Sequence, residues 1–354
     1  MKAVQLFAPG DLRIVDAPMP EVGDDEVLVK VAAVGVCGSD IPRVLKKGTY
    51  RMPLTIGHEF SGEIVTLGRR VEGWAAGERV TVAPLMPCYR CHWCRQGAYH
   101  LCDDYDYFGS RCDGALAEFV RAPTANLVRL PAGVDAEAGA MADPAATALH
   151  GIWRGSLGPG DTVAVYGIGA IGFFVVQWAR LMGAQQIMAV DVYDDKLQLA
   201  RELGATLTIN ALAEDPAARI QAATGGLGAD LVIETAALQA TQIQAIRSAR
   251  KQATVVLLGI SGDELPLPAA IVDKVMRHEV NVTGSWNSNS QPFPGRELER
   301  RIRDCRSPSL RTMHPGHPSG SRRPSEVGSD GHEMYCPGLP WRDGTAPDCS
   351  HLPA

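Results

Sequence analysis

The stretch Val163-Ala164-Val165-Tyr166-Gly167-Ile168-Gly169-Ala170-Ile171-Gly172 decides the fold of this chain. An apolar, β-branched run enters a turn with glycines at its first, third and sixth positions, and an apolar segment without glycine or proline follows. In such a turn the first glycine permits the sharp bend, the second lets the backbone approach a pyrophosphate, and the third lets a helix pack on the strand. The spacing alone also fits an ordinary strand–helix turn.

The residue that favours a dinucleotide is Asp191. It ends a second apolar run, Gln186–Val190, about 20 residues beyond the glycines, where a carboxylate can accept hydrogen bonds from both ribose hydroxyls. A 2′-phosphate would be repelled by Asp191, and Val192-Tyr193 offers no arginine to receive one. The sequence therefore predicts a site for NAD rather than NADP, formed by Gly167, Gly169, Gly172 and Asp191.

Length, charge and composition bound the remaining possibilities. With 354 residues the chain can form two domains, and its formal net charge of −6 argues against nucleic acid as a partner. The segment Met1–Phe7 lacks a long apolar core and is followed by Pro9-Gly10, so we expect neither a secretory signal nor a membrane span. We therefore expect a cytoplasmic protein, in which nine cysteines are metal ligands or bystanders rather than disulfides.

The two halves of the chain differ in pattern. The first is rich in short strands and glycine-flanked loops, whereas the second alternates strands with helices. The fold class is accordingly predicted as α/β: a β-rich domain, followed by a doubly wound parallel sheet of about six strands. The expected strands are Glu26–Val34, Ile64-Val65, Arg79–Val82, Thr206–Ile209, Asp230–Glu234, Ala253–Leu258 and Val280–Ser285, and the expected helices are Ala145–Ser156, Asp194–Leu203 and Ala240–Ala249.

The most specific motif is a series of four cysteines, Cys88, Cys91, Cys94 and Cys102. Three cysteines at intervals of three, with a fourth shortly after, can converge as thiolates on one tetrahedral zinc ion. Four thiolates leave no open coordination position, so such a site is structural. His92 lies inside the loop, and the even cysteine series makes it a solvent-facing residue rather than a ligand.

A second, more dispersed set of residues can form a different kind of metal site. Each member is unremarkable alone, since a lone cysteine or histidine is usually part of a core. Together they can supply thiolate, imidazole and carboxylate to a zinc ion that keeps one position open for substrate. The members are Cys37, His58, Glu59 and Asp143.

These motifs together resemble those of the zinc-dependent medium-chain alcohol and polyol dehydrogenases, over residues 1 to about 300. The resemblance rests on Gly35-Val36-Cys37-Gly38-Ser39-Asp40, on Gly57-His58-Glu59 and on the four-cysteine loop. Three further stretches resemble the galactitol-1-phosphate 5-dehydrogenases within this family, namely Ser39–Arg43, Tyr107–Arg111, and Gly284-Ser285-Trp286 with Pro292–Gly295 after it.

The resemblance implies a GroES-like catalytic domain, a Rossmann coenzyme domain and two zinc ions. The catalytic zinc would bind Cys37, His58 and Asp143, with Glu59 as an alternative or outer ligand. This chain has Asp143-Pro144 where close family members have Glu-Pro, so the shorter Asp143 would ligate through a shifted backbone or through water. Asp40 matches a residue that orients the ligating histidine. Ser39 matches the hydroxyl that begins the proton relay.

The implied reaction is oxidation of a secondary alcohol by NAD, for this branch galactitol 1-phosphate to L-tagatose 6-phosphate. A phosphorylated substrate needs a cation, and Arg43 is the predicted anchor because a guanidinium fork suits phosphate. Lys46 and Lys47 are better explained as a solvated face. The alternatives are a sorbitol (L-iditol) or threonine dehydrogenase, a zinc-free quinone reductase, and an inactive remnant that binds zinc and NAD.

The pattern changes after about Arg300. Ile302, Leu310, Val327, Leu339 and Leu352 are the only Ile, Leu, Val or Phe residues of this tail, too few for a core layer. A frameshift, a natural disordered tail or a metal-binding tail can explain it. The predicted domains are 1–145 (zinc-binding catalytic), 146–286 (NAD-binding), 287–300 (return toward the catalytic domain) and 301–354 (anomalous tail). The resemblance also implies a homodimer or homotetramer, paired through the edge strand Val280–Ser285.

Overall fold

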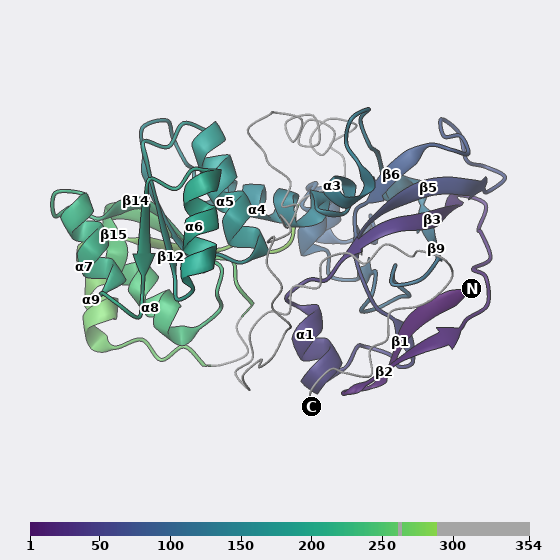
Figure 1. The fold of residues 1–354 in the computed structure, drawn as a ribbon, viewed down its shortest axis with the longest axis horizontal. Helices are drawn as coiled ribbons and strands as arrows, with labels where there is room; N and C mark the ends of the chain where they lie inside the picture. Colours follow the sequence, from purple (N-terminus) through teal and green to yellow (C-terminus); the bar gives the residue numbers. More distant parts are fainter. Residues whose placement is uncertain (261–263, 289–354) are drawn as a thin grey trace, which may run out of the picture. The chain divides into compact units, whose positions relative to one another are not determined.

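The computed structural model describes residues 1–260 and 264–288, which form two compact units (Figure 1). One unit contains residues 1–91 and 103–142, and the other contains residues 92–102 and the described chain from Asp143 onward. The predicted boundary at residue 145 falls inside helix α4 (Ala142–Arg154), close to this division. The expectations for residues 289–300 and for the tail 301–354 lie outside the described residues. Within the described ranges no helix is both long and apolar enough to cross a membrane.

The first unit is built on antiparallel strands, as the pattern of its sequence predicts. Its main sheet has the order β10-β6-β5-β3-β9, and two small sheets, β2-β1-β4 and β7-β8, accompany it. The core of the main sheet joins Val27 and Val29 of β3 to Phe60 and Ile64 of β5. The strands are β1 Lys2–Ala8, β2 Asp11–Asp16, β3 Glu26–Gly35, β4 Leu54–Thr55, β5 Glu59–Leu67, β6 Arg79–Val82, β7 Leu85–Met86, β8 Asp106–Tyr107, β9 Phe119–Pro123 and β10 Leu127–Arg129.

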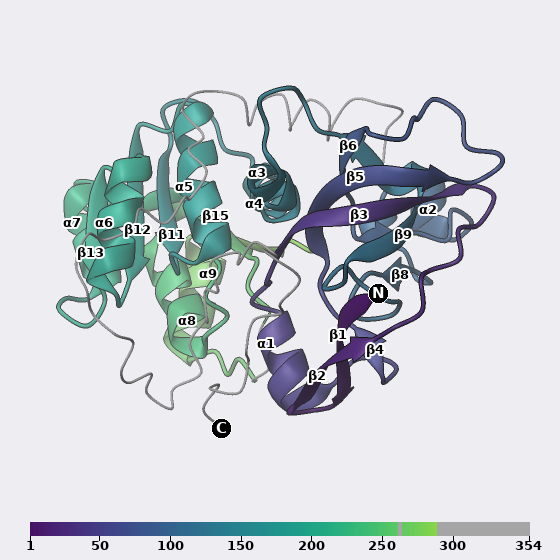
Figure 2. The same ribbon diagram turned by 45° about the vertical axis from the view of Figure 1, so that its right-hand side comes forward.

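Short helical segments connect these strands. The segment that follows β3 turns at once into α1 and η1, which can be followed in Figure 2, and this places Cys37 to Lys47 at one end of the sheet. The helical segments of the loops are α1 Asp40–Pro42, η1 Arg43–Lys47, α2 His92–Arg95, η2 Tyr99–Leu101, η3 Thr124–Asn126 and α3 Ala136–Ala140.

The second unit is a doubly wound parallel sheet, which confirms the predicted fold class. Its six strands run in the order β13-β12-β11-β14-β15-β16, so the chain reverses direction across the sheet between β11 and β14. Helices α5 and α6 pack together, and α7, α8 and α9 form a second row (Figure 1). The strands are β11 Thr162–Tyr166, β12 Gln186–Asp191, β13 Leu207–Asn210, β14 Ala229–Glu234, β15 Ala249–Leu257 and β16 Asn281–Gly284.

Two helices of this unit, α7 and α9, were not expected from the sequence. Helix α7 begins at Pro216, and the side chain of Asp215 accepts hydrogen bonds from the amides of Ala217 and Ala218. An Asp-Pro pair at a helix start is a recognisable capping signal. The helices are α4 Ala142–Arg154, α5 Ala170–Leu181, α6 Asp194–Leu203, α7 Pro216–Ala223, α8 Gln239–Ser248 and α9 Ala269–Arg277.

Candidate functional site

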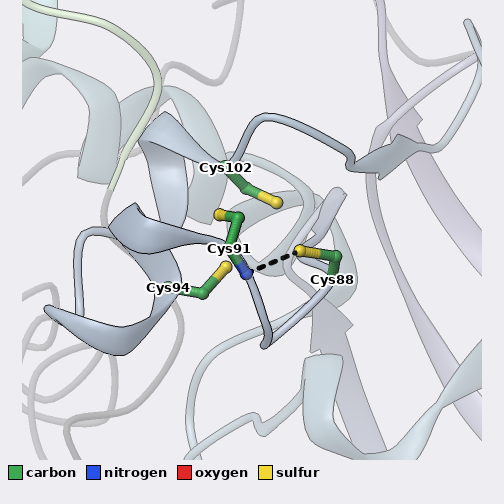
Figure 3. Close-up of side chains that lie close together, drawn as sticks. All are labelled: Cys88, Cys91, Cys94 and Cys102. Atoms are coloured by element: carbon green, nitrogen blue, oxygen red, sulfur yellow. Dashed lines mark hydrogen bonds between the residues drawn. The ribbon is translucent and has the colours of Figure 1, made fainter.

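The four cysteines of the predicted structural zinc site converge in the structure. Their sulfur atoms all lie within 4.8 Å of one another, and Figure 3 shows them directed toward a common centre. A tetrahedral zinc ion with Zn–S bonds of about 2.3 Å needs sulfur atoms about 3.8 Å apart. The amide of Cys91 also donates to the sulfur of Cys88 at 3.4 Å, which stabilises that sulfur as a thiolate. Cys88, Cys91, Cys94 and Cys102 therefore fit a structural zinc ion, whereas His92 is exposed and outside the group.

A second group of possible ligands lies in the first unit. Cys37, His58 and Glu59 offer a sulfur, an imidazole nitrogen and a carboxylate oxygen within 4.8 Å of one another. Strand pairing brings them together, because the end of β3 and the start of β5 are paired at Gly35 and Glu59. The carboxylate of Glu59 passes over Gly35, where an added Cβ would lie 2.5 Å from Oε2. The donor set suits zinc.

Charged groups surround this second group. Asp40 Oδ1 lies 3.4 Å from Nδ1 of His58, which leaves Nε2 as the nitrogen for a metal ion. The backbone amide of Cys37 donates to Asp40 Oδ2 at 3.3 Å. Arg43 Nη1 donates to Asp40 Oδ1 at 3.0 Å and to Ser39 Oγ at 2.9 Å, and Ser39 in turn donates to the sulfur of Cys37 at 3.3 Å.

Burial shapes the protonation of these groups. It raises the pKa of the Cys37 thiol above its ordinary value. It also opposes ionisation of Asp40, but the neighbouring His58 and Arg43 outweigh it and hold the pKa of Asp40 below its ordinary value. Asp40 is therefore a carboxylate. A cation bound by Cys37 would supply the charge that converts its thiol to the thiolate, so metal binding at this group would release a proton.

Asp143 belongs to the second unit, whereas Cys37, His58 and Glu59 belong to the first. It occupies the first turn of α4 in the second unit, and the three-residue group does not include it. Its role as a ligand stays a prediction.

The glycine turn has the geometry that the sequence predicts for a dinucleotide site. Gly167 has a φ of 87°, in the left-handed region that favours glycine. A Cβ on Gly172 would lie 2.1 Å from the carbonyl oxygen of Gly167, so only glycine allows α5 to pack this closely on β11. Gly169 caps the N-terminus of α5, where backbone amides can bind phosphate.

Asp191 lies at the end of β12 and is linked to the same turn. Its Oδ2 accepts a hydrogen bond from the amide of Ile168 at 2.7 Å, and its Oδ1 accepts from the amides of Val192 and Tyr193 at 2.7 and 3.1 Å. The carboxylate is thus fixed beside the glycine turn.

Three functional candidates were not among the predicted site residues. The ring of Tyr107 contacts that of His58 edge-on, with centroids 5.3 Å apart. The guanidinium of Arg111 lies between the rings of Tyr50 and Tyr105. Tyr107 and Arg111 both occur in the Tyr107–Arg111 stretch, where no sequence pattern reveals their role. Glu234 ends β14 fully buried, and its Oε1 accepts from the amides of Ala236 and Ala237. Its position after an apolar strand is the signal that could have identified it.

Comparison with known families and proteins agrees with both units. The alcohol dehydrogenase GroES-like domain matches residues 23–132, and the zinc-binding dehydrogenase domain matches residues 170–300. Galactitol 1-phosphate 5-dehydrogenase of Escherichia coli (strain K12) is 37% identical over 305 residues, which cover 86% of this chain and 88% of that protein.

Solved structures give the same result. The crystal structure of galactitol-1-phosphate dehydrogenase from Escherichia coli matches with a TM-score of 0.83 and 35% identity, covering 88% of this chain and 90% of that one. A zinc-binding dehydrogenase of Sinorhizobium meliloti 1021, bound to NADP, matches with a TM-score of 0.81 and 33% identity over 88% of this chain and 90% of that one. The chain therefore belongs to the zinc-binding medium-chain alcohol and polyol dehydrogenases, oxidoreductases that act on CH–OH groups with a nicotinamide coenzyme.

Proposed function

We propose that this protein uses NAD to oxidise a secondary alcohol of a polyol phosphate, with galactitol 1-phosphate as substrate and L-tagatose 6-phosphate as product. The observation that carries the proposal is the second group of ligands, Cys37, His58 and Glu59, with the hydroxyl of Ser39 beside it. The identity of 37% to a galactitol 1-phosphate 5-dehydrogenase supports the choice of substrate.

Cys37 and His58 would hold a catalytic zinc ion, with Glu59 or Asp143 as the carboxylate ligand. The ion supplies Lewis-acid activation of the substrate hydroxyl. Asp40 keeps the ring of His58 in one orientation and one tautomer. Because Arg43 donates to both Asp40 and Ser39, it fixes the carboxylate and the hydroxyl in one arrangement.

Ser39 is the proposed first member of a proton relay: its hydroxyl would accept the alcohol proton while passing its own proton on to the coenzyme ribose or to water. Its Oγ donates to the sulfur of Cys37 at 3.3 Å, so it would lie close to an alcohol bound by the ion that Cys37 would hold. The coenzyme supplies the acceptor for the hydride. Gly167, Gly169 and Gly172 would hold its pyrophosphate, and Asp191 its ribose hydroxyls.

The preference for NAD rests on the charge of Asp191. Its carboxylate is fixed beside the glycine turn by three backbone amides, so a 2′-phosphate placed there would meet an unneutralised negative charge. The next residues, Val192 and Tyr193, offer no cation to offset it.

The test is a turnover assay on the zinc-loaded full chain. Galactitol 1-phosphate, galactitol, sorbitol and L-threonine are compared, each with NAD and with NADP. We expect the highest kcat/KM for galactitol 1-phosphate with NAD, and a higher value for sorbitol or L-threonine would refute the proposed substrate. Cys37→Ser should abolish turnover while NAD still binds, because the glycine turn is untouched. Wild-type turnover in that variant would refute the assigned metal site.

Arg43, which the sequence resemblance suggests as the phosphate anchor, has surroundings that give it a second role. One of its nitrogens, Nη1, is already engaged with Asp40 and Ser39. Arg43→Ala should therefore lower turnover of free and phosphorylated polyols alike through Asp40, and a larger loss for the phosphorylated substrate would assign the phosphate to Arg43. Lys46 and Lys47 are exposed, as a solvated face requires.

A further inference from the structure

A second arginine in the first unit has surroundings that suit an anion. The guanidinium carbon of Arg111 lies 4.1 Å from the ring centroid of Tyr50 and 4.4 Å from that of Tyr105. In the described part of the chain no carboxylate forms an ion pair with Arg111, and its Nε is buried without a hydrogen-bond partner. Most arginines of this unit that stack or bridge loops have an acid partner, as Arg51 has in Asp113.

The aromatic contacts prepare this arginine for binding. The two flanking rings limit the conformations that the Arg111 side chain can adopt, so less conformational entropy is lost when an anion binds. Stacking uses the faces of the guanidinium plane and leaves its edge, which carries the N–H donors, for hydrogen bonds. A buried donor without a partner in the protein is the kind of group that a ligand satisfies.

The position of Arg111 connects it to the catalytic group. The ring of Tyr105 contacts that of Tyr107 at a centroid distance of 6.4 Å, and Tyr107 contacts His58 at 5.3 Å. The residues from Arg111 to His58 thus form a continuous series of side-chain contacts within one unit. Tyr50 follows η1 closely in the chain, and its amide donates to the carbonyl oxygen of Ser110 at 3.1 Å. This hydrogen bond holds Tyr50 against the segment that carries Arg111.

We propose that Arg111, held between Tyr50 and Tyr105, binds the phosphate group of the substrate while the alcohol to be oxidised lies at Cys37 and His58. This inference rests on the proposed function and identifies the residue that selects phosphorylated over free polyols. Arg43 then positions the metal ligand His58 through Asp40, and Arg111 binds the phosphate at the far end of the substrate.

The experiment compares Arg111→Gln with a matched control, Arg129→Gln. Arg129 also stacks on an aromatic ring, at 4.0 Å from Trp74, but its Nε is paired with Glu78 at 2.9 Å and it lies in β10. Steady-state kinetics of the zinc-loaded full chain are measured with galactitol 1-phosphate and with galactitol. Calorimetry measures the binding of inorganic phosphate to the same proteins.

For Arg111→Gln we expect kcat/KM for galactitol 1-phosphate to fall roughly 10- to 100-fold, the effect of losing a charge-assisted hydrogen bond, with little change for galactitol. Arg111→Lys should recover part of the loss, because it restores the charge without the planar fork. Binding of inorganic phosphate should weaken in parallel. Arg129→Gln should leave all of these values unchanged.

Three results would overturn the inference. In Arg111→Gln, these are an equal loss of kcat/KM for both substrates, which indicates a packing role, or no loss for either substrate. The third is a loss in Arg43→Ala that is confined to the phosphorylated substrate. The proposed function fails separately, if the wild type oxidises no polyol phosphate. In that case phosphate calorimetry still decides, since unchanged affinity in Arg111→Gln refutes the site and lost affinity supports it.

Discussion

Replacing Gly172 by alanine tests whether close packing in the glycine turn positions the coenzyme site. A Cβ at this position would lie 2.1 Å from the carbonyl oxygen of Gly167 and 3.1 Å from its carbonyl carbon. Ordinary carbon–oxygen contacts are more than 3 Å long, so α5 and the turn must separate by about 1 Å. The atoms that clash are backbone, and they cannot move aside by a rotamer change.

Two consequences of Gly172→Ala can be measured separately. Overpacking of this kind costs about 1–3 kcal/mol of folding free energy, which a urea unfolding curve detects. The shift also moves the N-terminus of α5 away from the pyrophosphate position. We therefore expect the affinity for NAD, measured by calorimetry, to fall by more than the stability loss alone would explain, about 10-fold or more.

Gly158→Ala is the matched control. An added Cβ there would meet its nearest atom, Oδ2 of Asp161, at 3.4 Å, an ordinary contact, and Gly158 precedes β11. This variant should retain wild-type NAD affinity and stability within about 0.5 kcal/mol. If Gly172→Ala bound NAD and unfolded like Gly158→Ala, the glycine would not be needed for helix packing, and the geometric argument for the coenzyme site would be refuted.

Further predictions concern the other sites. Burial raises the pKa of Glu234, so its neutral form is favoured in the folded state. Relative to Glu234→Gln, the stability of the wild type should therefore fall as pH rises above the ordinary pKa of 4.5. Urea midpoints of the two proteins that change with pH in parallel would refute this. Cys102→Ser should lose about one equivalent of zinc by metal analysis and unfold at lower urea, whereas Cys112→Ser should keep its zinc, because Cys112 is outside both ligand groups. Asp191→Asn should narrow the preference for NAD over NADP by roughly tenfold in kcat/KM, and an unchanged ratio would contradict the assigned role.

The elements that periodicity and glycine spacing define were predictable. Helix α6 has the predicted bounds, and β11, β12 and β14 differ from the prediction by a residue or two, because each is an uninterrupted apolar run in a buried parallel sheet. Helix α9 was not predicted, although it is amphipathic, with Ile271 buried and Met276 exposed. Strand β15 begins at Ala249, within a polar stretch that resembles a helix end.

The metal ligands were predictable in type and not in arrangement. The regular spacing of Cys88, Cys91 and Cys94 identifies a metal site locally, because residues this close in sequence are close in space. Cys37 and His58 are separated by a strand, a helical turn and a loop, so only the register of β3 with β5 brings them together. A resemblance to a family supplied that information, and residue spacing could not.

The contacts of the side chains around the ligands were predictable only in part. Asp40 and Arg43 are three residues apart in the helical segment α1–η1, where side chains at this spacing face one another, so a sequence reading could have paired them. It could not have shown that Arg43 also holds Ser39, or that Arg111 lacks an acid partner in the described chain. The distinction matters for function. An arginine that neutralises a buried carboxylate has part of its charge compensated already, whereas one that is flanked only by aromatic rings keeps its charge available for a substrate.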